Sequence, residues 1–260
     1  MLFSCVLLSL FALPSCLLSD VQIVQFPTID TFESIHSYIS PTEKTLVGWD
    51  LDNTLVTTPQ ELGSDEWFYF NVNRRVNEGH DFIHALHLVL PTYFFIQFNS
   101  PLILTDAIIP HMLKRFADEN VYTLALTARS LYIADRTIEQ LQNISISFHL
   151  PANVPTDFYL PLKNPAIYKG GILFSGNNDK GDVLIYFLRY TQLYPDHIVF
   201  IDDKDHNLEN VKIAVESNRI RFTGLRYSGC DAKVAAFDPE QAERQMEQLL
   251  SERIINPIHA

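Results

Sequence analysis

The sequence predicts an α/β fold in which a central sheet lies between two layers of helices. Short apolar segments that are typical of buried strands alternate with longer segments whose apolar residues recur at helical spacing. The strand segments end in acidic or hydroxyl side chains, as strands do at the carboxyl edge of an open sheet. The segments between them are long enough for the right-handed β-α-β crossovers that a parallel sheet requires.

The expected elements follow one another along the chain. Asp30 or Thr31 caps a short amphipathic helix, and the first core strand comes shortly before Asp50. Helices are expected over 31–39, 106–119, 131–142, 183–193, 208–217 and 239–252, and strands over 45–49, 121–126, 172–174, 197–201 and 220–225.

Residues 57–104 fit none of these β-α units. They contain Trp67, many other aromatic residues and a His-rich helical run over 80–90. We expect a small, mainly helical insertion whose aromatic residues chiefly form its own core, with a platform for a substrate as the alternative. The expected organisation is a leader over 1–19, a core domain over 20–56 and 105–260, and the insertion over 57–104.

Composition excludes several classes of function. A chain of 260 residues with 47% hydrophobic and 19% charged residues can bury the core of one or two domains. Its formal charge of −12 argues against nucleic acid and anionic membrane surfaces as partners. Cys5 and Cys16 lie in the leader, so Cys230 alone remains for the mature chain, which excludes an intramolecular disulfide and a cysteine zinc site there.

The N-terminus has the pattern of an export signal. Residues 1–19 carry no charged side chain, and 2–13 are almost wholly apolar, a length that suits a signal core better than a membrane span. The segment Leu13-Pro14-Ser15-Cys16 approximates a lipobox in which Cys16 would be acylated, although Pro14 departs from the usual residue and Lys44 is the first basic residue. We expect an exported protein, either periplasmic or tethered to a membrane through Cys16, with a secreted or cytoplasmic protein as the alternative.

Two carboxylates, Asp50 and Asp52, stand one residue apart where the first core strand opens into a loop. Like charges this close raise each other's pKa unless a cation or hydrogen-bond donors compensate. A catalytic pair beside a bound cation explains the placement, and so does an Asx-type turn at the end of a strand. Three further signals follow in order, namely Thr127 after the second strand, Lys180 before a helix, and the pair Asp202 and Asp203 after a third strand.

This pattern resembles the haloacid dehalogenase (HAD) superfamily of phosphohydrolases. Its motifs are an Asp-x-Asp-x-Thr strand end, a Thr or Ser after the second strand, a Lys at the start of a helix and a final acidic pair. The steps from Asp50 to Thr127, Lys180 and Asp202 are 77, 53 and 22 residues. The resemblance covers about residues 44–228, and the segment 63–68 (Gly-Ser-Asp-Glu-Trp-Phe) also resembles a bacterial HAD-like family of unassigned function. It implies a Rossmann-like three-layer core with the insertion as a cap.

The resemblance also implies a mechanism. Asp50 would attack phosphorus to form an aspartyl phosphate, and Asp52 would act as acid and then as base. Thr127 would donate a hydrogen bond to the phosphoryl group, and Lys180 would neutralise its charge.

The same resemblance implies Mg²⁺ as the cofactor. Its ligands would be Asp50, the backbone carbonyl of Asp52, and Asp202 or Asp203. Arg129 and Asn53 are further candidates for contacts with the substrate, with a structural ion pair as the alternative for Arg129.

The expected activity is a Mg²⁺-dependent phosphatase that acts on a phosphorylated small molecule or phosphopeptide. A phosphotransferase would share the intermediate, and an exported interaction or host-directed protein on the same scaffold is the alternative from another class. All four motifs of the resemblance retain their polar residues, which argues against an inactive protein that only keeps the scaffold.

Overall fold

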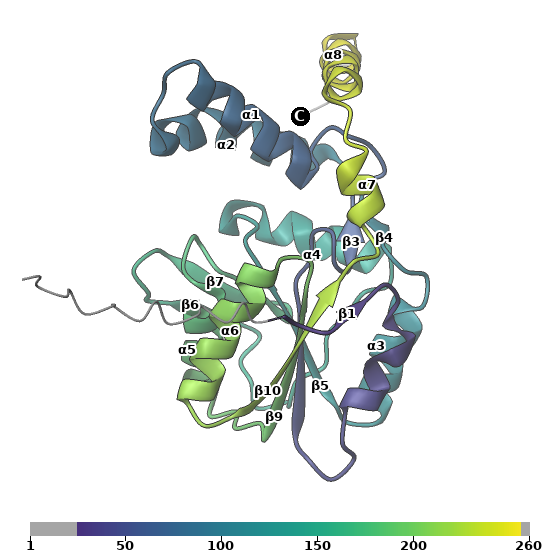
Figure 1. Ribbon diagram of the computed structural model, residues 1–260, viewed down its shortest axis with the longest axis vertical. Coiled ribbons are helices and arrows are strands. Elements are labelled where there is room, and N and C mark those ends of the chain that lie inside the picture. Colours follow the sequence, from purple (N-terminus) through teal and green to yellow (C-terminus); the bar gives the residue numbers. More distant parts are fainter. Residues whose placement is uncertain (1–24, 256–260) are drawn as a thin grey trace, which may run out of the picture.

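The computed structural model describes residues 25–255 and shows a mixed α/β fold (Figure 1). The leader over 1–19, with Cys16, lies outside the described residues. An eight-stranded sheet has the order β1-β10-β9-β2-β5-β8-β7-β6, and its first six strands are mutually parallel. The strands are β1 (Thr28–Ile29), β2 (Thr45–Trp49), β5 (Tyr122–Thr127), β6 (Asp157–Leu160), β7 (Ala166–Lys169), β8 (Ile172–Phe174), β9 (His197–Asp202) and β10 (Arg221–Tyr227).

Helices cover both faces of the sheet, as the sequence predicts (Figure 1). On one face, α3 (Ile109–Asp118) and α4 (Ala134–Asn143) contribute to a core around Trp49 and Phe116. On the other face, α5 (Lys180–Thr191) and α6 (Asp205–Ser217) pack on Leu46 and Phe200. Strand β2 is buried at every residue because both of its faces meet a helical layer.

Several elements differ from the sequence prediction. The antiparallel strands β6 and β7 were not predicted, and β6 lies at the edge of the sheet with Tyr159 exposed, so it lacks a clear apolar pattern. Helix α3 begins three residues later than expected because Pro110 occupies its first turn. Residues 32–38 form a 3₁₀ helix, η1 (Phe32–Tyr38), and α4 follows another short one, η2 (Leu131–Ile133).

The insertion is a pair of helices joined to the core by a two-stranded antiparallel ribbon of β3 (Val56–Thr57) and β4 (Ile103–Leu104). Its helices are α1 (Asp65–Asn77) and α2 (Phe82–Asn99). Ser64 caps α1 by accepting a hydrogen bond from the Trp67 amide at 3.1 Å. Gly63 precedes this cap with a positive φ of 84°, and a Cβ there would lie 2.6 Å from Ile96 of α2, so only glycine fits.

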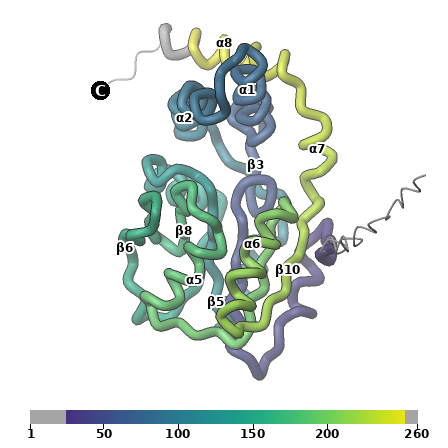
Figure 2. The backbone as a smooth tube through the Cα atoms, turned by 60° about the vertical axis from the view of Figure 1, so that its left-hand side comes forward, coloured from purple at the N-terminus to yellow at the C-terminus, as the bar shows by residue number. Residues whose placement is uncertain are grey.

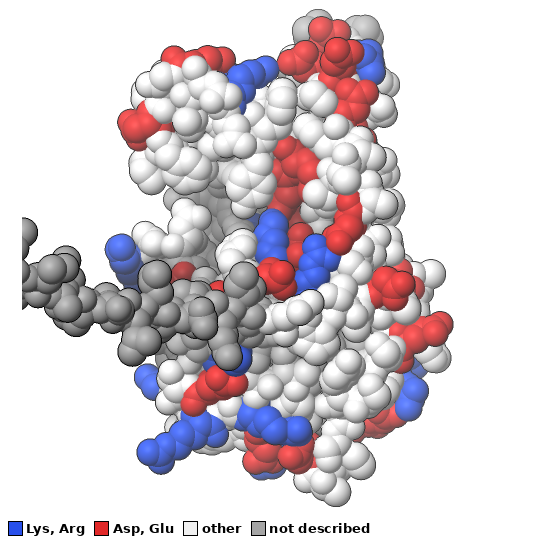
Figure 3. Space-filling view, viewed as in Figure 1, with Lys and Arg blue, Asp and Glu red and all other residues white. Residues whose placement is uncertain are grey.

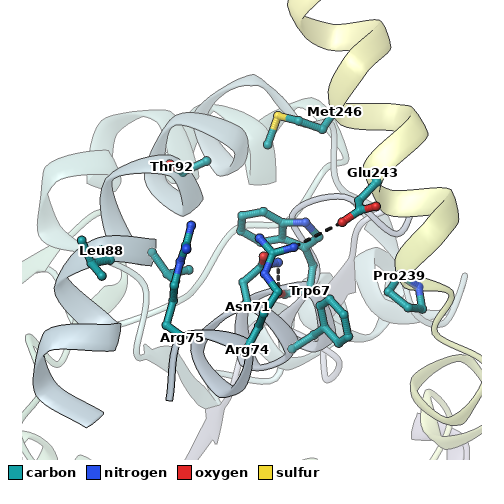
Figure 4. A pocket seen from close by; sticks show the side chains of 11 residues that line it. Trp67, Asn71, Arg74, Arg75, Leu88, Thr92, Pro239, Glu243 and Met246 are labelled. Atoms are coloured by element: carbon teal, nitrogen blue, oxygen red, sulfur yellow. Dashed lines mark hydrogen bonds and ion pairs between the residues drawn. The ribbon is translucent and has the colours of Figure 1, made fainter. Parts of the chain in front are cut away.

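The end of the described chain returns to this helical pair. After α7 (Asp231–Ala235), helix α8 (Pro239–Ile255) lies beside α1 and α2, well away from the sheet (Figures 1 and 2). Arg74 of α1 pairs with Glu243 at 3.2 Å, and Gln245 accepts a hydrogen bond from the Leu62 amide at 2.9 Å. A cavity of about 180 Å³ remains between the three helices (Figure 4). The apolar residues Ala242, Met246 and Leu249 of α8 pack against the core of the insertion.

Within residues 25–255, no helix combines the length and the apolar character that crossing a membrane would require.

Candidate functional site

Three neighbouring parallel strands bring the motif residues to one edge of the sheet. Asp50 follows β2, Thr127 ends β5 and Asp202 ends β9, and β2 lies between the other two strands. From β2 the chain continues to β5 on one side of the sheet, and it later adds β9 on the other side of β2. The strand order therefore reverses beside β2, and open α/β sheets bind ligands at such a topological switch point. Lys180 reaches the same edge because it opens α5.

A compact cluster of carboxylates forms the centre of this site. Asp50, Asp202 and Asp203 each offer an oxygen, and these oxygens all lie within 4.8 Å of one another. The Nζ atom of Lys180 donates to Asp50 Oδ1 and to Asp202 Oδ2, each at 2.7 Å. Burial alone would lower the pKa of Lys180, but these two carboxylates outweigh it, so the pKa is raised and the ammonium stays charged.

The two adjacent carboxylates, Asp202 and Asp203, differ in their partners. Asp202 is fully buried, and its second oxygen accepts hydrogen bonds from the Lys204 amide and the Asn207 side chain, both at 2.9 Å. Asp203 Oδ1 is also buried, yet within residues 25–255 it has no hydrogen-bond partner. Burial and the nearby charge of Asp50 raise the pKa of Asp203 to about 8. Asp203 is therefore the carboxylate whose charge the protein itself leaves least compensated.

The donor set fits a hard divalent cation. The three clustered groups are carboxylates, and Mg²⁺ prefers oxygen ligands together with retained water. Burial raises the pKa of Asp50 to about 7 even though Lys180 opposes the shift. A cation between Asp50 and Asp203 would compensate both charges and would give the orphaned Asp203 oxygen a partner.

Asp52 lies beside this cluster and forms a fork-to-fork ion pair with Arg129. The Nε and Nη2 atoms of Arg129 donate to the two Asp52 oxygens, each at 2.7 Å. Arg129 is nearly inaccessible, with a side chain 2% exposed, and its backbone amide donates to Thr127 Oγ1 at 3.0 Å. The structural ion pair expected as one alternative for Arg129 is thus present, and its guanidinium also lines the cavity described below.

Asn53 turns away from the site. It adopts a positive φ of 57°, and its amide nitrogen donates to Glu66 in α1 at 2.9 Å. It is not among the residues that line the cavity. Asn is one of the few residues other than glycine that readily adopts this left-handed conformation, so Asn53 has a structural role in the loop.

Lys204, Asp65 and Tyr93 form a cluster that the sequence analysis missed. Lys204 Nζ donates to Asp65 Oδ2 at 2.6 Å, and the Tyr93 hydroxyl donates to Asp65 Oδ1 at 3.0 Å. Burial alone would raise the pKa of Asp65, but the interactions with Lys204 and Tyr93 outweigh it, so the pKa is lowered. The sequence contained a signal, since Lys204 directly follows the acidic pair and Asp65 lies in the segment 63–68.

A cavity of about 730 Å³ lies between the helical pair and the carboxyl edge of the sheet. Asp50, Asp52, Thr127 and Lys180 line it from the sheet side, and α1 and α2 line it from the other side. Figure 3 shows the molecule hollowed between its upper and lower parts, with acidic and basic side chains gathered at mid-height on this face. The arrangement can hold a ligand of considerable size against the carboxylate cluster.

Fold and site together define a class of protein, an α/β protein with a buried carboxylate and lysine centre beneath a helical insertion. More specifically, residues 28–256 match the model of the family described as "Protein of unknown function (DUF2608)", and the chain belongs to that family.

Curated relatives include a "Putative outer membrane protein" of Chlamydia trachomatis, 24% identical over 76% of this chain and 74% of its own length. A relative of the same description in Chlamydia pneumoniae is 26% identical over 68% of this chain and 67% of its own. An uncharacterised protein of Rickettsia prowazekii is 24% identical over 95% of this chain and 92% of its own length. No solved structure matches the chain.

Proposed function

We propose that the protein is a Mg²⁺-dependent phosphatase of the HAD type that hydrolyses a phosphate monoester through an aspartyl phosphate. The observation that carries the proposal is the contact of Lys180 with both Asp50 and Asp202 beside the orphaned oxygen of Asp203. In this proposal Asp50 is the nucleophile, Lys180 is the fixed cation, and both line the sheet side of the large cavity beside the carboxylates that would hold a metal. The helical insertion above them would be the cap of such an enzyme.

In the first step, an Asp50 oxygen bonds to phosphorus while the bond to the substrate's ester oxygen breaks. Asp52 gives its proton to that leaving oxygen. Thr127 and Lys180 hold the phosphoryl oxygens, and Lys180 also offsets the charge that builds up beside Asp50. When bound, Mg²⁺ would be held by Asp50, the Asp52 carbonyl and Asp203, and would supply charge stabilisation on the phosphoryl group.

In the second step, Asp52 takes a proton from water, the water oxygen bonds to phosphorus, and Asp50 leaves as a carboxylate with release of phosphate. The two hydrogen bonds from Arg129 hold both oxygens of Asp52 in a fixed orientation beside Asp50. Arg129 is thus a positioning residue for the acid and base.

An envelope location fits this enzyme. Relatives in Chlamydia carry the description of outer membrane proteins, and the apolar leader over 1–19 has the composition of an export signal. We propose an exported phosphatase that is either periplasmic or tethered to a membrane by a lipid on Cys16. Fractionation of cells, followed by mass measurement of the mature N-terminus, tests this location.

The activity is tested with purified protein and a generic aryl phosphate. Phosphate release should require Mg²⁺, vanish in chelator, and vanish in Asp50→Asn, which keeps the shape of the side chain and removes the attacking charge. Asp196→Asn is a matched control, because Asp196 binds the Lys44 amide at the opposite edge of the sheet. Turnover by Asp50→Asn within about tenfold of the parent would contradict the assignment, since loss of a nucleophile costs several orders of magnitude.

A further inference from the structure

The cavity has two walls of opposite character. The wall beside the carboxylate cluster is polar and carries amide and hydroxyl groups such as those of Asn164, Ser175 and Asn178. The opposite wall is formed by α1 and α2 and is mainly apolar, with Phe68, Tyr69, Phe82, Leu86, Leu90 and Phe94, and its polar members are Asp65, Tyr93 and Gln97.

The part of the apolar wall that belongs to α2 is a stripe of large apolar residues at four-residue spacing. Phe82, Leu86, Leu90 and Phe94 fall on one face of the helix and line the cavity. A separate set, which includes Ala85, Val89 and Ile96, is buried in the core of the insertion. Leu86 and Phe94 also pack partly against this core, so the stripe joins the core of the insertion to the cavity, and Phe82 and Leu90 are its members outside that core.

The stripe is only partly covered in this structure. Phe82 is 54% exposed, and the next three members are half-buried. Apolar surface that faces a cavity is stabilised when a ligand removes it from water, by about 25 cal/mol for each Å² buried. Helix α2 has no aspartate, glutamate, lysine or arginine along its 18 positions, so the stripe Phe82, Leu86, Leu90 and Phe94 offers no ionic partner to a polar ligand.

The charges around the cavity also restrict the ligand. Among the residues that line it, the lysine and arginine side chains are already engaged, Lys180 by the carboxylate cluster, Arg129 by Asp52 and Lys204 by Asp65. A second phosphate group on the ligand would find no uncommitted lysine or arginine within this lining. This disfavours nucleoside polyphosphates and bisphosphates.

We propose that the site takes amphiphilic phosphate monoesters, in which one phosphate is attached to a sizeable uncharged apolar or aryl group. The phosphate lies at the carboxylate and lysine centre, and the apolar group lies along the stripe Phe82–Leu86–Leu90–Phe94. This proposal rests on the proposed phosphatase function for turnover, but the binding preference follows from the cavity walls alone. Phe82 and Leu90 are the residues that we expect to determine specificity.

Binding is tested first, with n-alkylphosphonates from ethyl to octyl, whose carbon–phosphorus bond the proposed reaction does not cleave. Isothermal titration in Mg²⁺, below the concentration at which the ligands form micelles, should show affinity rising about twofold to fourfold for each added methylene group that the stripe buries. Equal affinity for ethyl- and octylphosphonate, or no binding of either, would overturn the proposal.

Variants locate the effect on the stripe. Phe82→Ala should weaken octylphosphonate binding about fivefold and leave ethylphosphonate within twofold, because a large apolar contact is lost only for the longer ligand. Leu90→Gln should reduce the dependence on chain length in the same way. Ile83→Ala is the matched control, since Ile83 is adjacent, 59% exposed and outside the lining. An equal loss in Ile83→Ala and Phe82→Ala would overturn the assignment to the stripe.

Turnover separates this proposal from the proposed function. The kcat/KM for octyl phosphate should exceed that for glucose 6-phosphate by at least about tenfold. Comparable values for the two substrates would overturn the substrate class and leave the phosphatase standing. Chain-length-dependent binding without turnover would support the ligand class and contradict the phosphatase.

Discussion

The ammonium of Lys204 lies 2.6 Å from Asp65 Oδ2 and so joins the loop that follows the acidic pair to the first turn of α1. Both side chains are largely buried, at 28% and 18% exposure. The ammonium also lies 5.3 Å from the centre of the Tyr69 ring, a cation–π contact from the same helix. The position of the helical insertion over the site is thus fixed partly by a charged residue adjacent to the catalytic candidates.

We expect Lys204→Met to lower the free energy of unfolding by about 1–3 kcal/mol, because it leaves the Asp65 carboxylate buried without its cation. Urea unfolding measures this loss, and hydrogen exchange should show weaker protection in α1. Lys114→Met is the control, since its pair with Asp118 is exposed at 73% and 65% and should contribute less than about 1 kcal/mol. Equal losses in the two variants would contradict a structural role for the Lys204 pair.

Asp203→Asn and Asp202→Asn should separate the metal ligand from the structural carboxylate. Asp203→Asn should raise the Mg²⁺ concentration required for half-maximal activity by more than about tenfold, because it removes the negative charge of the carboxylate whose oxygen lacks a partner within the described residues. Asp202→Asn should chiefly lower stability, because Asp202 accepts hydrogen bonds from Lys180, Lys204 and Asn207. Mg²⁺ titrations of activity and urea unfolding in chelator measure the two effects, and the reverse pattern would assign the ligand to Asp202.

The stabilisation by Mg²⁺ should depend on pH. Burial raises the pKa of Asp50 to about 7 and of Asp203 to about 8, from an ordinary value of 3.8. Between pH of about 4 and about 8, Asp50 and Asp203 keep protons in the folded metal-free protein that they have lost in the unfolded chain. The free energy of unfolding of the metal-free protein therefore falls as pH rises through this range. Mg²⁺ compensates the ionised carboxylates, and the rise in Tm that it causes should therefore be larger at pH 8 than at pH 6. In Asp203→Asn this difference should shrink, and an unchanged difference would show that another group is responsible.

Asp52→Asn should accumulate the phosphoenzyme. The amide cannot take a proton from water, so the second step slows more than the first when the leaving group is a good one such as an aryloxide. Intact mass measurement after mixing with an aryl phosphate should show one added phosphoryl group, and Asp50→Asn should show none. Phosphorylation of the double variant Asp50→Asn/Asp52→Asn would place the nucleophile elsewhere.

The sheet and its polar edge were largely predictable, because the signals are local. The strands 45–49 and 197–201 each contain an uninterrupted run without polar side chains, 46–49 and 198–201, and each run is followed directly by an aspartate, a pattern that is visible without any tertiary information. The antiparallel edge strand β6 was not predictable because only its pairing with β7 makes it a strand.

The partners of the site residues were not predictable to the same extent. Arg129 was foreseen near Thr127, but its pairing with Asp52 joins residues 77 positions apart. The contact of Lys204 with Asp65 spans 139 positions, and no local pattern records which carboxylate a lysine will meet. Likewise, the sequence suggested that the aromatic insertion packs on itself, whereas the structure divides its apolar residues between that core and the cavity wall.

The return of α8 to the helical pair has a consequence for the order of folding. Every strand of the sheet precedes residue 228, so a chain emerging from N- to C-terminus can assemble the sheet and the carboxylate centre first. The apolar core of α1 and α2 includes Ala242 and contacts Phe237 and Met246, so it stays incomplete until the following segment has emerged. The helical pair above the cavity can therefore complete its apolar core only after residues 237–249 have emerged, later than all the strands that carry the carboxylate centre.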